Sequence, residues 1–249
     1  MIFSNLKNVT FIKKNEPVFK NEIGEYLDKL NHLDKKSKLV KIVLDYIDNP
    51  YKSNPLIRES DNFPSLSLFY QDCSVFVANS LALSESENYS EFIKNYSEFF
   101  YYSGGEIAFD RRIHFTEDRI LTSLKYPLYL PVEFKSIEEN LTCVLNKKKN
   151  GEKLLNIDFE KKIVLKLIPA AHIAAITDFI KLNNQILGAA FVRKKNDDNG
   201  HLISHEGFLV ETELFHASKD SGKVCRISDF AAYFKNCKFD GAVFFKTVI

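Results

Sequence analysis

The chain has 249 residues, of which 45% are hydrophobic and 27% charged, and its formal net charge is +1 at pH 7. This is the composition of a globular protein with enough residues for one substantial core or two small ones. A net charge near zero provides no general attraction to nucleic acid or to an acidic membrane surface, so neither is expected as a partner.

The first hundred residues show the apolar period of helices. Residues 21–48 carry two such stripes, and Asp34 or Ser37 is expected to cap the second helix. Residues 89–101 form a later, aromatic-rich helix. The segment Ser103-Gly104-Gly105 is expected to end that helix as a turn, since it lacks the full pattern of a phosphate loop.

Residues beyond 126 alternate between apolar and polar types, as strands do. We predict strands at Leu128–Phe134, Leu141–Leu145, Ile163–Ile168, Ile186–Val192, Ser204–Val210, Leu214–Ser218 and Ala242–Val248. Asn146–Gly151 reads as a hairpin turn, and His172 as a core or strand residue. Ser228 is expected to cap a short helix over Asp229–Phe234. Helices followed by strands predict one α+β domain over residues 1–249.

The sequence shows no segment typical of membrane insertion or of a signal peptide, and no closely spaced pair of cysteines. No apolar run approaches the roughly 20 residues of a transmembrane helix, and residues 1–17 lack the apolar segment of a signal peptide. The sequence therefore leaves three alternatives open: residence in the cytoplasm, export by another route, or a sequence that is already trimmed. Four cysteines are scattered without a CxxC pair, which disfavours a metal finger. Cys225 and Cys237 would form a disulfide if paired, but free thiols are favoured.

Cys73 opens an apolar stretch, residues 73–83, that is typical of a buried helix. Asp72 is a suitable N-cap for it. A cysteine in the first turn of a helix is favoured as the thiolate, because the backbone N–H groups and the macrodipole stabilise negative charge there. A lone cysteine in this place is more often a small core residue. Only the two histidines further along the chain favour the interpretation of Cys73 as a nucleophile.

Two histidines, His205 and His216, lie on predicted neighbouring strands joined by Glu211-Thr212-Glu213. Residues directly opposed on one face of an antiparallel pair have Cβ atoms about 5 Å apart. One imidazole can take the proton of a thiol while a second polar group fixes its orientation. We therefore expect His205 and His216 to serve Cys73, far upstream in the chain.

A metal site is the competing interpretation of these histidines. His201 and His205 are four residues apart, with Glu206 and His216 nearby, and on a helix that spacing suggests zinc. On a strand, however, His201 and His205 would be about 13 Å apart along its axis. The strand-like pattern thus favours no metal and no cofactor.

The segment Phe109–Phe115 contains a basic cluster that includes Arg112 and His114. It reads either as a solvated turn, paired with Asp110, Glu117 and Asp118, or as a clamp for a substrate carboxylate. The clamp is chemically attractive because arginine offers a bidentate fork.

Three motifs in order resemble those of the NlpC-type papain-like cell-wall peptidases. They are Asp72-Cys73-Ser74-Val75-Phe76-Val77, Ser204-His205-Glu206-Gly207-Phe208 and Phe215-His216-Ala217-Ser218, followed by a matching tail at Val224–Phe230, Tyr233 and Gly241-Ala242. The resemblance implies a papain-like α+β fold, with N-terminal helices packed on an antiparallel sheet. It also implies Cys73 as nucleophile, His205 as base and His216 as the third group.

The chain is similar over nearly its whole length to one branch, the N-acetylmuramoyl-L-alanine amidase-like proteins. The matching segments are Ile47–Tyr51, Arg112-Ile113-His114-Phe115 and a large insertion, about residues 85–190, between nucleophile and base. This resemblance implies cleavage of the amide between N-acetylmuramic acid, in its 1,6-anhydro form, and L-alanine of peptidoglycan fragments. It implies that Tyr51, Arg112 and His114 bind the substrate, and that the protein is periplasmic or secreted.

Two departures from the branch concern specificity more than chemistry. Gly188-Ala189-Ala190 stands where the branch has Gly-Asp, and the chain has no tryptophan, with Arg119 near the usual place. A muropeptide-binding protein without turnover is one alternative. A secreted effector acting on host proteins is another, but effectors of that kind place the histidine well before the cysteine, and only His32 precedes Cys73.

Overall fold

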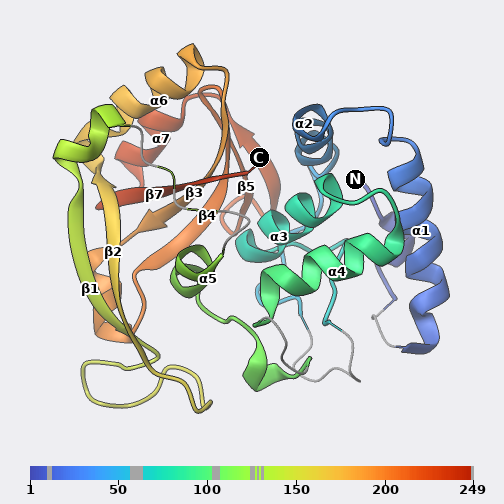
Figure 1. Cartoon of the computed structure of the whole chain (residues 1–249), viewed down its shortest axis with the longest axis horizontal. Coiled ribbons are helices and arrows are strands. Elements are labelled where there is room, and N and C mark those ends of the chain that lie inside the picture. Colours follow the sequence, from blue (N-terminus) through green and yellow to red (C-terminus); the bar gives the residue numbers. More distant parts are fainter. Residues whose placement is uncertain are drawn as a thin grey trace. The chain divides into compact units, whose positions relative to one another are not determined.

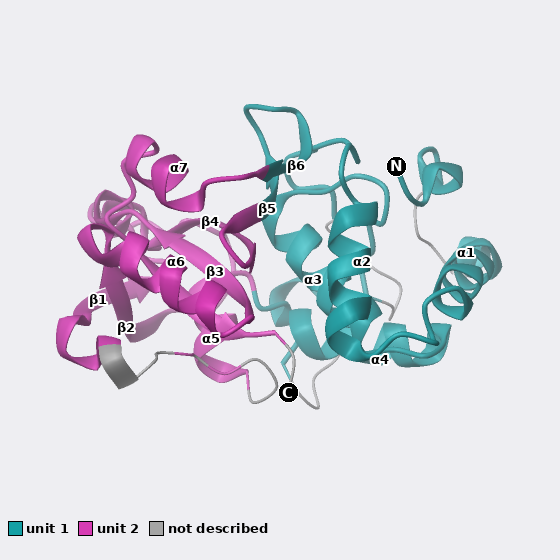
Figure 2. Cartoon of the chain, turned by 90° about the horizontal axis from the view of Figure 1, so that it is seen from above, with its two compact units in different colours: residues 1–113, 215–226 teal, residues 114–214, 227–249 magenta. Residues whose placement is uncertain are grey.

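A computed structural model describes residues 1–9, 13–56, 64–102, 107–123, 127, 129 and 132–247. Contacts divide the chain into two compact units, which Figure 2 draws in different colours. Unit 1 comprises residues 1–113 and 215–226, and unit 2 comprises residues 114–214 and 227–249. The turn predicted at Ser103–Gly105 lies outside the described residues.

The elements follow the predicted order of helices first and strands later (Figure 1), so the predicted α+β class is confirmed. The helices are α1 (Glu16–Asp28), α2 (Lys35–Asp45), α3 (Cys73–Ser84), α4 (Tyr89–Phe100), α5 (Thr116–Thr122), α6 (Ile173–Leu182) and α7 (Phe230–Asn236). The strands are β1 (Glu139–Leu145), β2 (Lys161–Pro169), β3 (Ile186–Val192), β4 (Ile203–Val210), β5 (Glu213–Ser218), β6 (Lys223–Ile227) and β7 (Gly241–Lys246). Their order in the sheet is β1-β2-β7-β3-β4-β5-β6. Among the described residues, no helix is both long and apolar enough to cross a membrane.

Helix α3 is the centre of unit 1. Every residue from Val75 to Ser84 is buried, as expected for a helix that is apolar on all sides. Side-chain caps begin the three neighbouring helices: Asp34 for α2, Asp72 for α3 and Asn88 for α4. Of the two caps considered for α2, the structure selects Asp34, which accepts the Ser37 N–H at 2.9 Å.

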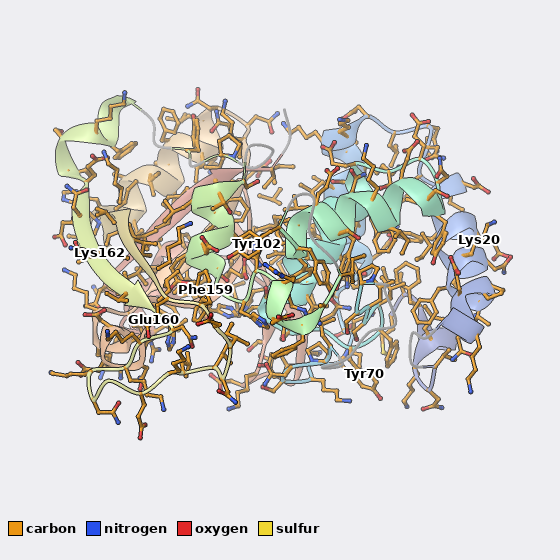
Figure 3. The ribbon with its side chains drawn as sticks, turned by 60° about the horizontal axis from the view of Figure 1, so that its bottom comes forward. Lys20, Tyr70, Tyr102, Phe159, Glu160 and Lys162 are labelled. Carbon is orange, nitrogen blue, oxygen red and sulfur yellow. The ribbon has the colours of Figure 1, made fainter. Side chains whose placement is uncertain are left out.

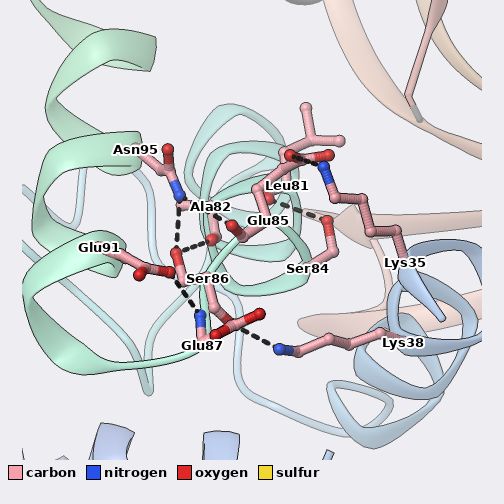
Figure 4. Close-up of polar contacts among 10 residues, drawn as sticks. All are labelled: Lys35, Lys38, Leu81, Ala82, Ser84, Glu85, Ser86, Glu87, Glu91 and Asn95. Carbon is pink, nitrogen blue, oxygen red and sulfur yellow. Dashed lines mark hydrogen bonds and ion pairs between the residues drawn. The ribbon is translucent and has the colours of Figure 1, made fainter. Parts of the chain in front are cut away.

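A buried lysine holds the C-terminal end of α3 (Figure 4). The Lys38 ammonium donates to the Ser86 carbonyl at 2.5 Å and to Asn31 Oδ1 at 2.9 Å. Asn95 of α4 donates to the Ser86 hydroxyl at 2.8 Å. Positive charge at this end complements the helix dipole, and burial lowers the pKa of Lys38. These hydrogen bonds connect α2, α3 and α4. They fix the position of α3, whose opposite end carries Cys73.

Unit 2 is built on the antiparallel pairs β1–β2, β2–β7, β7–β3 and β3–β4. All seven residues of β3 are buried, as is typical of a central strand covered on both faces. One apolar cluster joins this strand to α6 and α7 (Figure 1). Within it the Phe191 ring packs on Phe230, Phe234 and Phe239, with centroids 5.1 to 5.6 Å apart.

The structure corrects several local expectations. Residues Val132–Ile137, which include part of a predicted strand, form a 3-10 helix. Asp229, and not Ser228, caps α7, because its carboxylate accepts the Ala232 N–H at 2.9 Å. His172 is a partly exposed residue at the start of α6, neither core nor strand.

The β1–β2 connection is longer than a tight hairpin turn, because Leu145 pairs with Lys161. Phe159, labelled in Figure 3, lies in this connection and stacks on Phe115, with ring centroids 5.8 Å apart. Asn146 donates to the Phe159 carbonyl at 2.8 Å. These contacts hold the long connection against the rest of unit 2. A two-residue turn would not need such contacts.

Candidate active site

Cys73 is the first residue of α3, as predicted. The extended backbone of Asp72 ends there, and the Asp72 carboxylate accepts the Val75 N–H at 2.8 Å. The thiol is partly buried. The remaining N–H groups of a first helical turn have no partner within the helix, so they and the macrodipole favour an anion at this position. Local structure therefore places Cys73 where a thiolate is stabilised.

A short backbone ladder in unit 1 connects the start of α3 to strand β6. Gln71 N–H donates to the Pro50 carbonyl, and the Gln71 carbonyl accepts from Lys52 N–H, both at 3.0 Å. On its other side, the same segment pairs with the strand region after His216: Tyr51 N–H donates to the Gly222 carbonyl at 2.8 Å. The residue before Asp72 and the strand pair that carries His216 are thus parts of one hydrogen-bonded layer.

Buried amides make this ladder rigid. Gln71 is fully buried, and its side chain donates to the Leu68 carbonyl at 2.7 Å and accepts from Asn79 of α3 at 3.1 Å. Asn49, also fully buried, bonds to both backbone groups of Ile2 at 3.0 Å. A buried amide that lost its partners would carry a large desolvation cost. The position of the Cys73 backbone is therefore strongly determined.

Tyr51 lies beside the segment that leads into α3. Tyr51 forms a parallel bridge with Gln71. Burial raises the pKa of the Tyr51 phenol, Ser53 opposes that rise through a hydrogen bond, and the negative charges of Cys73 and Asp72 add to it. Tyr51 is thus a neutral hydroxyl close to the thiol, able to donate a hydrogen bond.

His216 is buried on β5, and one of its ring nitrogens contacts a second cysteine. The Cys225 sulfur on β6 lies 3.3 Å from His216 Nε2. Burial lowers the pKa of His216 from 6.5 to about 4 and raises the pKa of the Cys225 thiol. Both groups are therefore neutral near pH 7, so this pair is not the thiolate–imidazolium pair of an activated nucleophile. Nothing in the sequence placed Cys225 beside His216, because the two residues are nine positions apart and meet only through strand pairing.

His205 belongs to unit 2, where it is partly buried on β4. It pairs with Phe191 of β3, and the two rings lie 5.5 Å apart between centroids. Since Phe191 is at the centre of the apolar cluster, one side of the imidazole is held by a rigid aromatic surface. The register shifts between Phe191 and Val192, which is a bulge directly beside this histidine.

Helix α5 holds β4 with buried carboxylates. Glu117 is buried and accepts the N–H groups of Leu202 and Ile203, at 2.5 and 2.6 Å, where β4 begins. Burial raises the pKa of Glu117, while these backbone donors oppose the rise. Asp118 is also buried and pairs with Lys161 at 2.5 Å. Tertiary contacts therefore bury both side chains, which the sequence offered only as ion-pair partners of the basic cluster at Phe109–Phe115.

Arg119 and Glu206 form a buried ion pair in the same place. Thr116 also donates to Glu206, at 3.0 Å. Glu206 follows His205 directly, so its side chain points to the opposite face of β4. Arg119, which the sequence places near the position of the family's tryptophan, thus stabilises β4, the strand that carries His205.

Arg112 belongs to unit 1 and His114 to unit 2, because the chain passes from one unit to the other between residues 113 and 114. In unit 1, Arg112 forms a bridge with Tyr101, and its guanidinium lies over the rings of Tyr101 and Phe109 at 5.9 and 5.6 Å. His114, in unit 2, is two residues before α5. Unit 1 therefore brings together Tyr51 with Cys73, and His216 with Cys225, while His205 and His114 belong to the other unit.

Metal-binding side chains do not gather in the described ranges: no group of three or more histidine, cysteine, aspartate or glutamate residues is arranged to hold an ion. All four cysteines are free thiols. Glu206, considered above as a possible ligand, is instead engaged by Arg119 and Thr116.

Known proteins resemble the chain in sequence and in fold. A family model described as AmiA-like, N-acetylmuramoyl-L-alanine amidase-like, matches residues 41–241. The crystal structure of a Legionella pneumophila protein of family DUF1460 is 15% identical, with 94% of this chain and 95% of that chain covered and a TM-score of 0.70. That of an N-acetylmuramoyl-L-alanine amidase from Bacteroides uniformis is 19% identical, with 85% and 98% covered and a TM-score of 0.63. At these identities the structural likeness concerns the fold, and no curated protein matches the sequence.

Proposed function

Because this chain belongs to the N-acetylmuramoyl-L-alanine amidase-like family, we propose that it is a cysteine amidase acting on peptidoglycan fragments. The bond cleaved is the amide between the lactyl carbonyl of N-acetylmuramic acid, in its 1,6-anhydro form, and L-alanine of the stem peptide. The proposed fold type is papain-like. The proposed site of action is the periplasm or the medium outside the cell, as the family resemblance implies, and the cytoplasm is the alternative.

The proposed reaction has two steps. His205 takes the proton of Cys73, the sulfur adds to the lactyl carbonyl, and the intermediate collapses to a thioester. The protonated His205 gives its proton to the departing amine, so a peptide with a free L-alanine N-terminus leaves. Water, deprotonated by His205, then hydrolyses the thioester to the free acid and restores the thiol.

The remaining residues have supporting roles in this proposal. Backbone N–H groups at the start of α3 stabilise the oxyanion, and the Tyr51 hydroxyl donates to the substrate carbonyl. His216 orients His205 and accepts its second N–H. Arg112 and His114 bind the muropeptide outside the scissile bond.

One observation carries the proposal: Cys73 is the first residue of an Asp-capped helix, beside a neutral tyrosine hydroxyl. A cysteine at a helix N-terminus is favoured as the thiolate, which is the nucleophilic form, and this supports Cys73 as the nucleophile. The family match supports the substrate class, since it spans both the Cys73 and the His205 segments.

The test is incubation with 1,6-anhydro and reducing-end muropeptides, followed by mass spectrometry of the products. We expect release of the L-alanine-led peptide by the wild type and loss of release in Cys73→Ala and His205→Ala. Cys237→Ala, a partly exposed thiol of unit 2, is the matched control and should keep full activity. Activity retained in Cys73→Ala would refute the mechanism. Binding of intact muropeptide without any cleavage by the wild type would identify a binding protein instead.

A further inference from the structure

His216 contacts Cys225, a residue outside the three sequence motifs. Strand β6 places the Cys225 sulfur 3.3 Å from His216 Nε2, and the same sulfur lies 3.9 Å from the Ser221 hydroxyl. The Ser221 N–H in turn donates to the Ser218 hydroxyl at 3.1 Å. The sulfur that contacts the imidazole thus belongs to a small polar cluster at the β5–β6 turn.

A neutral imidazole has one N–H donor and one acceptor nitrogen, and the partner of one nitrogen decides the role of the other. In the proposed function, His216 must accept the N–H of His205, since the base becomes a cation during the reaction. The nitrogen that accepts must therefore carry no proton. Nε2 is in contact with the Cys225 thiol, so the proposed function requires Nδ1 to be the accepting nitrogen and Nε2 to carry the proton of His216.

We propose that Cys225 is a positioning residue whose sulfur accepts the Nε2–H of His216 and so selects the tautomer in which Nδ1 is an acceptor. This inference rests on the proposed function and adds to it a residue outside the three motifs. Cys225 is not a second nucleophile; it acts on the reaction only through His216.

The chemistry of a thiol suits this task. Sulfur is a weak acceptor without formal charge, so it orients an N–H and does not draw a second proton onto the ring. Asp220 is the charged group that favours protonation of His216, but burial outweighs it, and the pKa of His216 falls to about 4. A carboxylate in place of the thiol would hold His216 as a cation, with no acceptor left for His205.

The direct test is the tautomer of His216 by 15N NMR of the imidazole nitrogens near pH 7. We expect the wild type to show Nε2 protonated and Nδ1 unprotonated. Cys225→Ser retains an acceptor and should keep this pattern, whereas Cys225→Ala should give a mixture of tautomers. Cys237→Ala is the control, with the wild-type pattern. A wild-type Nδ1–H tautomer, or an unchanged pattern in Cys225→Ala, would overturn the inference.

Kinetics provide the second readout. A wrong tautomer of an orienting group strongly lowers turnover, so we expect kcat for muropeptide cleavage to fall at least about tenfold in Cys225→Ala, with KM nearly unchanged. Cys225→Ser should recover most of that loss, and Cys225→Asp should lose activity with a cationic His216 in the NMR spectrum. Equal kcat in wild type and Cys225→Ala would contradict the role. The NMR result does not depend on turnover, so a wild type that fails to cleave muropeptides would refute the proposed function separately.

Discussion

The Arg119 guanidinium donates to the Glu206 carboxylate, and both side chains are almost completely buried, at 4% and 1% exposure. Glu206 is the immediate neighbour of His205, on the opposite face of β4. The pair therefore fixes the strand from the side that does not face the proposed chemistry.

Arg119→Met should destabilise the protein strongly. Removing one partner of a buried pair leaves an uncompensated charge and typically costs about 3 to 5 kcal/mol. Urea unfolding of the variant measures this cost. The matched control is Lys194→Met, whose partner Glu139 forms an exposed ion pair at 2.7 Å and whose loss should change stability by less than about 1 kcal/mol. Adding Glu206→Gln to Arg119→Met should recover part of the loss, and equal costs for Arg119→Met and Lys194→Met would contradict the role.

Gly188→Ala should also destabilise unit 2, because a Cβ at this position would lie 2.0 Å from two ring atoms of Phe245. Overpacking of a core typically costs about 1 to 3 kcal/mol. Gly24→Ala in α1 is the control, since a methyl group at that position would meet no atom within 4 Å. There alanine should stabilise by about 0.5 to 1 kcal/mol. Thermal unfolding of both variants gives the comparison, and a neutral Gly188→Ala would show that Phe245 can move.

Asp72→Ala should slow alkylation of Cys73 in addition to lowering stability. Loss of an N-cap typically costs about 1 kcal/mol, and fraying of the first turn removes the N–H groups that favour the thiolate. Asn88→Ala removes the equivalent cap of α4, whose side chain accepts the Glu91 N–H at 3.1 Å, and should cost similar stability without changing alkylation. Iodoacetamide rates at Cys73, followed by peptide mass spectrometry, decide between them. Equal rates in the two variants would argue against a special first turn.

The buried His216 should make the protein less stable in mild acid. Its pKa is lowered from 6.5 to about 4, so between these values the unfolded state binds a proton that the folded state does not. The contribution of His216 to stability is therefore constant above pH 6.5 and becomes increasingly unfavourable as the pH falls towards 4. The full shift corresponds to about 3 kcal/mol.

Denaturant unfolding at pH 7 and at pH 4 measures this dependence. His216→Gln cannot titrate, so its stability should fall less than that of the wild type over the same interval. Parallel curves for the two proteins would show that His216 is protonated in the folded state, or that it is not buried.

Local signals were sufficient for much of the fold. Asp72 and the apolar residues after Cys73 predicted the capped helix α3, because an N-cap acts within one turn. The continuous apolar run Ile186–Val192 predicted a buried strand, and that prediction is confirmed. The motifs around Cys73, His205 and His216, together with the segments Ile47–Tyr51 and Arg112–Phe115, were also sufficient to identify the amidase-like family, which the match over residues 41–241 confirms. The roles of these three residues stay predictions.

Long-range contacts decided the rest. Glu117, Asp118 and Arg119 have the composition of a solvated helix, yet all three are buried, because their partners lie up to 87 residues away in sequence. Desolvation and ion pairing depend on those partners, and no local pattern contains them. Cys225 is a different case, because it is only nine residues from His216. The sequence by itself showed a cysteine without a CxxC partner, and only the pairing of β5 with β6 showed that its sulfur lies against the imidazole.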